Sequence, residues 1–507
     1  MFPPESFAVG VAVDWLEPPP GPDVLPEGVM SSRPARIGDL LSVASMTPEQ
    51  KAFQLQRVQQ AEAMLAGYRV ELVVGLAEDR PASMDRRRGQ RGGASGQWAD
   101  DPLDEDTSEF FADELAMVLN CSRTAATQQW EQSVTLLRRL PVTWAALADG
   151  RLDWSRARAI ADELGWPARE TPDDVVAAVE AAVLPQAAGL SIKRLRALAH
   201  RQLIAADPGA AERRGTRAQR AADVTVRGIG DGLGEVRATL PLPEAEEIRA
   251  RTDADARAAK AAGDERPIGQ LRGVALHARV TGAGQDRPAV SAHVEVVASL
   301  DTLEAAAAGA PGVGREPVLV GGEPVTTDLA REYLQRLDAL CPGGLQAPAG
   351  GGLMLSVVDA GGRLLACVTR RELETAVRHG RGLCRPPAVD RYAPSPGQRR
   401  FTTTRDRTCR HYGCSNRAGW ADLDHVLAHA EGGETDCTNL CCLCRRHHRL
   451  KTHAHGWRYV MTPDGVLTIT TPSGVTRVSR PPGMTADDDD PSVLRVTADR
   501  DPDPPPF

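Results

Sequence analysis

Long apolar segments are missing from this 507-residue sequence. No stretch approaches the ~20 consecutive apolar residues that a membrane-spanning helix needs, which argues against a membrane-spanning role. The first residues, MFPPESFAVGVAVDW, hold prolines and an acid where a signal peptide needs a basic start and an apolar run. We therefore expect no membrane partner and a location in the reducing cytoplasm.

A surplus of positive charge is also missing. The formal net charge is −8, which argues against a surface that binds nucleic acid over its whole extent. The charge is unevenly distributed, because residues 395–460 contain eleven Lys and Arg against six Asp and Glu, a balance of +5 that leaves −13 for the rest. One basic region therefore lies within an acidic protein.

Cysteine is not needed here to stabilise a small fold. A chain of 507 residues is long enough for about two to four domains with ample core. Yet six of the ten cysteines and seven of the eleven histidines fall between Cys409 and Trp457. Core packing does not produce such clustering, so we take this region as a candidate metal site.

Most of the chain before that region has a helical pattern, with apolar residues recurring every three to four positions. The predicted helices span 47–76, the region 108–205 with short breaks, 243–262 and 267–280. Thr47 and Pro48 are typical of a helix start, and alternating apolar residues in SAHVEVVASL predict one strand. We assign residues 46–300 to one helical domain, with a mobile loop at 80–106.

Composition sets the other boundaries. The predicted parts are a disordered, proline-rich arm at 1–45, a connector at 301–394 with a short helix near 329–340 and a hairpin at 353–368, a compact domain at 395–480, and a disordered acidic tail at 481–507. Within the compact domain, Asp464-Gly465 and Ser473-Gly474 predict the turns of further hairpins between 457 and 478.

Two pairs of metal-ligand residues lie in the compact domain. Cys409 and Cys414 flank a glycine, and Cys444 and His447 follow about thirty residues later with two residues between them. Thiolates and an imidazole at such spacing are typical of a tetrahedral zinc site, which stabilises a segment with little apolar content. Other thiols and imidazoles nearby leave the ligand set open, and the substitutes are Cys437, Cys441, Cys442, His411, His453 and His455.

Between and after these pairs the sequence reads DHx6GGx5NLxxLCxxHH. Asp424-His425, Asn439 and His448 fall in this pattern, with Asn439 fourteen residues after His425 and His448 nine residues after Asn439. The pattern resembles the HNH endonuclease family. The resemblance implies a fold class with a mainly α N-terminal region and a small C-terminal α+β domain of the ββα-metal type, which carries a structural zinc knuckle.

The resemblance also implies a hydrolysis of DNA phosphodiester bonds. His425 would be the general base that takes a proton from water, since an imidazole titrates near neutral pH. Asp424 and His448 would hold one divalent cation such as Mg²⁺, in addition to the structural Zn²⁺. Asn439 has two alternative duties, to pin the loop that orients His425 or to join the metal shell, and we favour the first.

Basic side chains surround the motif and suit contacts with phosphates. The candidates for DNA binding are Arg405, Arg407, Arg445, Arg446, Arg449 and Lys451. For any one of them a solvated surface charge is an equally good interpretation. HNH domains that cut both strands often work in pairs, so a homodimer is an expectation from the resemblance.

The upstream region resembles actinobacterial proteins in which a helical domain of unknown function precedes a C-terminal HNH domain. The matching segments are ELAMVLNCSRTAA, LLRRLPVTWAALADGRLDWSRARAI, LVGGEPV, DRYAPSPGQRRFTTTRDRTCRHYGC and HHRLKTHAHGW. Within the first segment, Glu114 to Ala126 has the spacing of a helix-turn-helix with Ser122 as a cap, although any antiparallel helix pair needs similar residues.

Three interpretations of the whole chain follow. The one we favour is a metal-dependent HNH endonuclease that acts on DNA. The alternative is a non-catalytic DNA-binding protein in which the zinc module is only a scaffold. A zinc-stabilised protein-interaction module is the third, but it gives no reason for Asp424, His425 and His448 to occur together.

Overall fold

The structure, a computed structural model, describes most of the chain. The described residues are 43–85, 106–220, 222–282, 296–299, 302, 317–321, 323–341, 344–347, 353–359, 361–380 and 382–484. Almost all of the predicted arm, of the predicted mobile loop and of the predicted acidic tail lies outside these residues. The chain divides into two compact units, residues 1–61 and 62–507.

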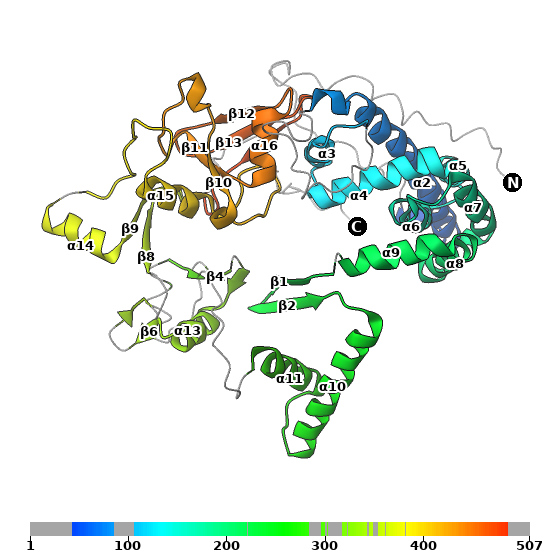
Figure 1. Cartoon of the computed structure of the whole chain (residues 1–507), viewed down its shortest axis with the longest axis horizontal. Helices are drawn as coiled ribbons and strands as arrows, with labels where there is room; N and C mark the ends of the chain where they lie inside the picture. Colours follow the sequence, from blue (N-terminus) through cyan, green and yellow to red (C-terminus); the bar gives the residue numbers. More distant parts are fainter. Residues whose placement is uncertain are drawn as a thin grey trace. The chain divides into compact units, whose positions relative to one another are not determined.

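The described part of the first unit is short. It contains a 3-10 turn, η1 (Val43–Ser45), and the beginning of a long helix, α2 (Pro48–Glu78), labelled in Figure 1. Thr47 and Gln50 cap this helix reciprocally, because the Thr47 hydroxyl accepts from the Gln50 N–H and the Gln50 side chain accepts from the Thr47 N–H. The predicted helix start at Thr47 and Pro48 is thus confirmed.

The second unit contains the rest of α2 and a group of helices that pack on it. These are η2 (Ala82–Met84), α3 (Phe111–Leu119), α4 (Arg123–Val134), the π-helical turn η3 (Thr135–Arg139), α5 (Pro141–Ala148), α6 (Trp154–Leu164), η4 (Trp166–Ala168), α7 (Asp173–Ala187), α8 (Ile192–Ala206) and α9 (Pro208–Arg220). Pro141 begins α5 because it has no N–H to donate to the preceding turn. Ser122 and Asp153 cap α4 and α6 through their side chains.

Two hydrophobic clusters hold this helical block together. The larger one joins α2 to α5, α6, α7 and α8 through buried aliphatic residues such as Val70, Leu147, Ile160 and Leu195. Gly67 of α2 lies so close to α5 that an added Cβ would come within 2.8 Å of the Ala148 Cα, which explains a glycine inside a helix. The smaller cluster packs α3 and α4 against the end of α2.

A β-hairpin interrupts the predicted helical domain. Strands β1 (Val224–Gly230) and β2 (Leu233–Ala238) pair antiparallel, and the turn residues Asp231 and Gly232 have φ angles of 52° and 72°. An Asp-Gly pair is a strong hairpin signal. The prediction for residues 46–300, one helical domain with a strand near its end, did not include this hairpin. Helices α10 (Leu242–Ala261) and α11 (Ile268–Thr281) follow as predicted.

The described residues between 296 and 378, which include the connector region, contain small sheets and two helices. Its elements are β3 (Val296–Val297), β4 (Val318–Val320), β5 (Glu323–Val325), α13 (Thr327–Arg336), β6 (Leu340–Cys341), β7 (Gly344–Leu345), β8 (Met354–Val358), β9 (Leu364–Thr369) and α14 (Arg370–Arg378). The predicted strand near 296 is thus reduced to two residues among those described. The short helix and the β8–β9 hairpin were expected, whereas the prediction did not include α14.

The C-terminal module carries the candidate metal residues. It contains α15 (Pro396–Asp406), η5 (Ala418–Trp420), β10 (Asp422–His425), η6 (His429–Glu431), β11 (Leu440–Leu443), α16 (Arg445–His453), β12 (Arg458–Met461), β13 (Leu467–Thr470) and β14 (Thr476–Ser479). Strands β10 and β11 pair antiparallel, and β12, β13 and β14 form a meander whose turns lie at the two predicted positions.

None of the helices in the described part of the chain is both long enough and apolar enough to cross a membrane.

Candidate metal centre and the acid-histidine cluster beside it

Four side chains converge on one point of the C-terminal module. One ligand atom from each of Cys409, Cys414, Cys444 and His447 lies within 4.8 Å of the others. The His447 Nδ1 atom is 3.4 Å from the Cys409 sulfur and 3.2 Å from the Cys444 sulfur. Zinc bonds of about 2.3 Å to sulfur and 2.0–2.1 Å to nitrogen put tetrahedral ligand atoms about 3.6 Å apart. The cluster can therefore hold a metal ion such as zinc.

Local backbone geometry brings these ligands together. Gly413 has a φ of +73°, which is the left-handed region that glycine adopts readily, and the turn returns Cys414 toward Cys409. Cys444 is the residue that precedes α16, so His447 follows it within the first helical turn. Both pairs are thus local features that sequence spacing can predict.

The other three thiols of the C-terminal module are core residues. Cys437, Cys441 and Cys442 are fully buried. Burial raises the pKa of Cys437 to about 11 and that of Cys441 to about 12, which keeps both thiols neutral. Among the described residues, the four predicted ligands form the cluster, and the other thiols and imidazoles proposed as alternative ligands are not part of it. One of these, His411, stacks on His447 with ring centroids 3.9 Å apart.

A second cluster, the acid-histidine cluster, lies between α16 and β10 and consists of Asp422, Asp424, His448 and Lys451. The His448 Nε2 atom is 3.5 Å from Asp424 Oδ1, and the His448 Nδ1 atom is 2.8 Å from Asp422 Oδ2. Consecutive helical residues point about 100° apart, which explains why His447 faces the sulfur cluster while His448 faces β10. Asp422 and Asp424 lie two residues apart on one strand and so share a face.

Lys451 closes this second cluster. Its Nζ atom lies 2.9 Å from Asp424 Oδ2, as an ion pair without hydrogen-bond geometry, and donates to the His425 carbonyl at 2.6 Å. The lysine therefore neutralises one oxygen of Asp424 and leaves the other facing His448. The His448 imidazole, oriented by Asp422, thus faces the Oδ1 atom of Asp424.

His425 lies next to this cluster and is held on several sides. Its Nε2 atom is 2.8 Å from the Thr435 hydroxyl, and its ring stacks on Tyr392 with centroids 5.3 Å apart. Among the described residues Nδ1 has no hydrogen-bond partner. Burial lowers the pKa of His425 from its ordinary value of 6.5. The charge of Asp424 opposes this shift, and nearby His429 and Lys451 add to it.

Asn439 joins the two ends of the loop between β10 and β11. Its Oδ1 accepts from the Leu427 N–H at 2.8 Å, and its Nδ2 donates to the carbonyls of Leu427 and Glu434 at 3.0 and 2.9 Å. Gly433 lies under this amide, where an added Cβ would meet the Leu427 carbonyl oxygen at 2.0 Å. The amide is thus fully occupied by the loop, which agrees with the pinning role.

Comparison with known proteins places the chain in a family. Residues 55–337, more than half of the chain, match the family described as Domain of unknown function (DUF222). This chain belongs to the DUF222 family. It is similar to two uncharacterized proteins of Mycobacterium tuberculosis, Rv2100 (34% identical over 196 residues, 38% of this chain and 33% of that protein) and Rv3776 (33% over 225 residues, 41% and 39%).

The matched region spans only about a third to two fifths of the length of these relatives. No solved structure matches the chain. The DUF222 match ends before the C-terminal module begins, so the metal-ligand cluster and the acid-histidine cluster lie outside it.

Several of the predicted DNA-binding residues make hydrogen bonds and ion pairs within the DUF222 protein. Arg405 is buried and donates to Asp406, Cys437 and Leu440. Arg446 binds Asp113 through two nitrogens, and Arg449 pairs with Glu109. The structure therefore gives these three a role in packing in place of the predicted phosphate contacts, because acidic groups and carbonyls already satisfy them. Arg445 has an 80% exposed side chain and Arg407 is half-buried.

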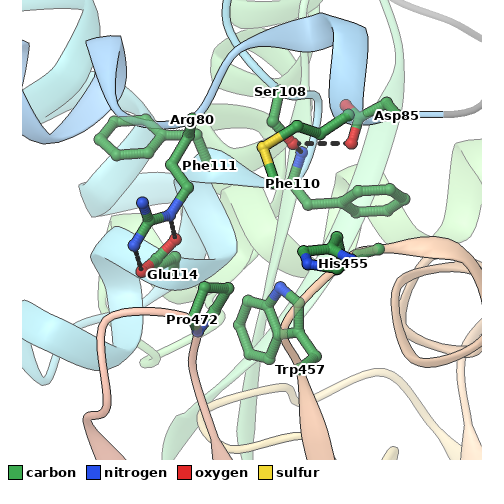
Figure 2. Close-up of a pocket in the computed structure, with 11 residues that line it drawn as sticks. Arg80, Asp85, Ser108, Phe110, Phe111, Glu114, His455, Trp457 and Pro472 are labelled. Atoms are coloured by element: carbon green, nitrogen blue, oxygen red, sulfur yellow. Dashed lines mark hydrogen bonds and ion pairs between the residues drawn. The ribbon is translucent and has the colours of Figure 1, made fainter.

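The DUF222 region meets the C-terminal module at a second place as well. Figure 2 shows Arg80 paired with Glu114 of α3, while His455, Trp457 and Pro472 approach from the C-terminal module. They line a small pocket of about 20 Å³. The predicted catalytic residues do not line it, so this pocket belongs to the junction and not to the acid-histidine cluster.

Sequence reasoning missed three residues that the geometry brings to these sites. Asp422 orients His448, Thr435 binds His425, and Asp113 of α3 lies 3.2 Å from His447. The DLDH alternation on one strand could have revealed Asp422. Nothing in the local sequence could have linked Asp113 to a histidine 334 residues later.

Proposed function

We propose that this DUF222 protein is a metal-dependent endonuclease of the HNH type that hydrolyses DNA phosphodiester bonds. The observation that carries the proposal is the meeting of Asp424 and His448, 3.5 Å apart, at the end of the strand that also carries His425. In the described part of the chain the His425 imidazole is engaged through Nε2 by Thr435, and Nδ1 has no partner. A scaffold alone gives no reason for these groups to converge. The order of β10, β11 and α16 agrees with a ββα-metal fold.

His425 is the general base in this proposal. Its Nε2 is engaged by Thr435, so Nδ1 is the atom that takes the proton from the attacking water. Its lowered pKa keeps the imidazole neutral, and hence basic, at physiological pH. Asn439 holds the loop that follows His425 and so keeps the ring in position.

Asp424 and His448 are the residues that would hold the divalent cation. A cation there would stabilise the negative charge that develops on the phosphate and on the leaving oxygen. Asp422 orients the His448 ring, and Lys451 shields the second oxygen of Asp424. An imidazole ligand suits Mn²⁺, Ni²⁺ or Zn²⁺ better than Mg²⁺, which prefers oxygen, so several cations belong in the assay.

Two exposed side chains near the cluster suit nucleic acid. Trp420 is 89% exposed and lies two residues before Asp422, where an aromatic face can stack on a base. Arg445 is exposed beside Asp422 and can reach a phosphate once a cation and DNA are bound. These features support DNA as the substrate class.

The test uses supercoiled plasmid with Mg²⁺, Mn²⁺ or Ni²⁺, and compares the parent protein with His425→Ala. The matched control is His277→Ala, an exposed histidine on α11. We expect nicking by the parent and by the control, and a loss on the order of 10²–10⁴-fold in His425→Ala. Equal residual nicking in all three proteins would assign the activity to a contaminant.

The alternative function is DNA binding without cleavage. It predicts that the parent shifts DNA in a gel without nicking it under any cation, and that His425→Ala binds equally well. Loss of Cys409 would abolish binding in this case, because the metal cluster would serve only as a scaffold.

A further inference from the structure

The metal-ligand cluster extends beyond the C-terminal module. Asp113 of α3 has a side chain that is 0% exposed, and its Oδ1 lies 3.2 Å from the Nε2 atom of His447. The other ring nitrogen of His447, Nδ1, faces the sulfurs of Cys409 and Cys444. The ring thus lies between the sulfur cluster on one side and a carboxylate of the DUF222 region on the other.

We propose that Asp113 is an outer-shell residue of the metal site, so that the DUF222 region takes part in binding the metal ion. An ion on Nδ1 requires the ring proton to be on Nε2, and an Nε2–H can donate to Asp113. Carboxylate partners of this kind fix the tautomer and the ring orientation and make the imidazole a stronger ligand. The inference does not depend on the nuclease proposal.

The local charges agree with an occupied site. Three thiolates and one Zn²⁺ carry a net charge of −1, and Asp113 adds another negative charge. Arg446 lies 2.6 Å and Arg123 lies 3.4 Å from Asp113, so two positive charges balance the two negative ones. A buried carboxylate without such partners would be strongly unfavourable.

Other contacts also hold α3 against the C-terminal module. Tyr412 donates to Asn120 at 2.7 Å, and Arg477 donates to the Met117 carbonyl at 3.0 and 2.9 Å. Met117 is itself buried in a cluster with Leu467 and Ile469 of β13. These contacts fix α3, and with it Asp113, beside the metal-ligand cluster, and a fixed partner costs less to order than a mobile one.

A simpler explanation is that Asp113 serves only as the ion-pair partner of Arg446. The two explanations predict different metal affinities when a neighbouring ion pair is broken. Glu109 and Arg449 pair at the same junction, and neither is one of the four metal ligands. A general loosening of the junction would lower metal affinity in Glu109→Gln as well. An outer-shell role predicts a lower metal affinity only in the Asp113 variants.

The test measures the binding of Zn²⁺ to the full chain by competition with a chromophoric chelator. Visible absorption on titration with Co²⁺ reports thiolate coordination in parallel. The proteins compared are the parent, Asp113→Ala, Asp113→Asn and Glu109→Gln, with circular dichroism to confirm that each is folded. Neither readout uses nuclease activity, so failure of this inference can be told from failure of the proposed function.

We expect Asp113→Ala to bind Zn²⁺ about 10- to 100-fold more weakly than the parent, the range for lost outer-shell partners. Asp113→Asn should lose less, because its carboxamide oxygen still accepts from Nε2–H. Glu109→Gln should bind like the parent. Parental affinity in folded Asp113→Ala, or an equal loss in Glu109→Gln, would overturn the proposal. If Asp113→Ala does not fold, parental affinity in Asp113→Asn overturns it and a reduced affinity supports it.

Discussion

The hydroxyl of Thr435 lies 2.8 Å from Nε2 of His425, and the same hydroxyl donates to the Tyr392 carbonyl at 3.4 Å. Because a hydroxyl has one proton, a Thr435 that donates to Tyr392 must accept from His425. The Nε2–H tautomer then leaves the Nδ1 lone pair for a proton from water. Thr435 is therefore a positioning residue for the proposed base.

Replacement of Thr435 by valine tests this relationship. Valine keeps the shape but removes the hydroxyl, while the Thr435 backbone carbonyl still accepts from Val389 and Gln398. We expect plasmid nicking to slow about 10- to 100-fold, as for other outer-shell partners, and Thr435→Ser to restore it. Nitrogen-15 NMR of the imidazole should show loss of the single Nε2–H tautomer in the valine variant. An unchanged rate and tautomer in Thr435→Val would contradict the role.

The pH dependence of cleavage follows from the environment of His425. Burial lowers the pKa of this imidazole below 6.5, and the base must be neutral to act. Activity should therefore persist as the pH falls through 6.5 and disappear only below it. The rate of nicking measured from pH 5 to 8 checks this, and an acid limb centred at or above 6.5 would count against it.

Replacement of Tyr392 by alanine provides a second test of the pH dependence of nicking. Its ring stacks on His425 and is itself 67% exposed, so Tyr392→Ala should let water reach the imidazole without removing a buried core residue. The pKa of His425 should then rise toward its ordinary value. We expect the acid limb to move to higher pH in this variant, while the rate on the plateau changes less.

The Asn439→Asp variant distinguishes the two alternative roles of Asn439, holding the loop that orients His425 or binding the metal ion. Aspartate can bind a cation but cannot donate to the Leu427 and Glu434 carbonyls, which the amide now does. If the amide pins the loop, Asn439→Asp and Asn439→Ala should both reduce nicking, on the order of 100-fold for a misplaced base. Near-parental activity in the aspartate variant with Mn²⁺ would instead assign Asn439 to the metal shell.

The sequence predicted those features that arise from local spacing. Cys444 and His447 lie within one helical turn, and the Asp464-Gly465 turn joins neighbouring strands, so their geometry follows from a few residues. The arginines could not be assigned in the same way. A sequence shows that Arg446 is charged but not that Asp113, 333 residues earlier, lies opposite it. The exposed β1–β2 hairpin was missed although its Asp-Gly turn was visible.

A buried charge cluster beneath β11 makes a further prediction, one about stability. Asp406 is fully buried, and its carboxylate binds Arg405 at 2.7 Å, Arg410 at 3.0 Å and the Cys442 N–H at 2.8 Å. Both guanidinium groups are buried as well, so this one carboxylate is their shared anion. Removing it would leave two cations in the core of the C-terminal module without their counter-charge.

We therefore expect Asp406→Ala to lower the free energy of unfolding of the C-terminal module by about 3–5 kcal/mol, the cost of breaking a buried ion pair. Urea denaturation in the presence of Zn²⁺ measures this change. Glu434→Gln, an exposed acid on the loop before β11, is the matched control and should change stability by less than about 0.5 kcal/mol. A loss as small in Asp406→Ala as in the control would show that water or a rearrangement compensates the two arginines.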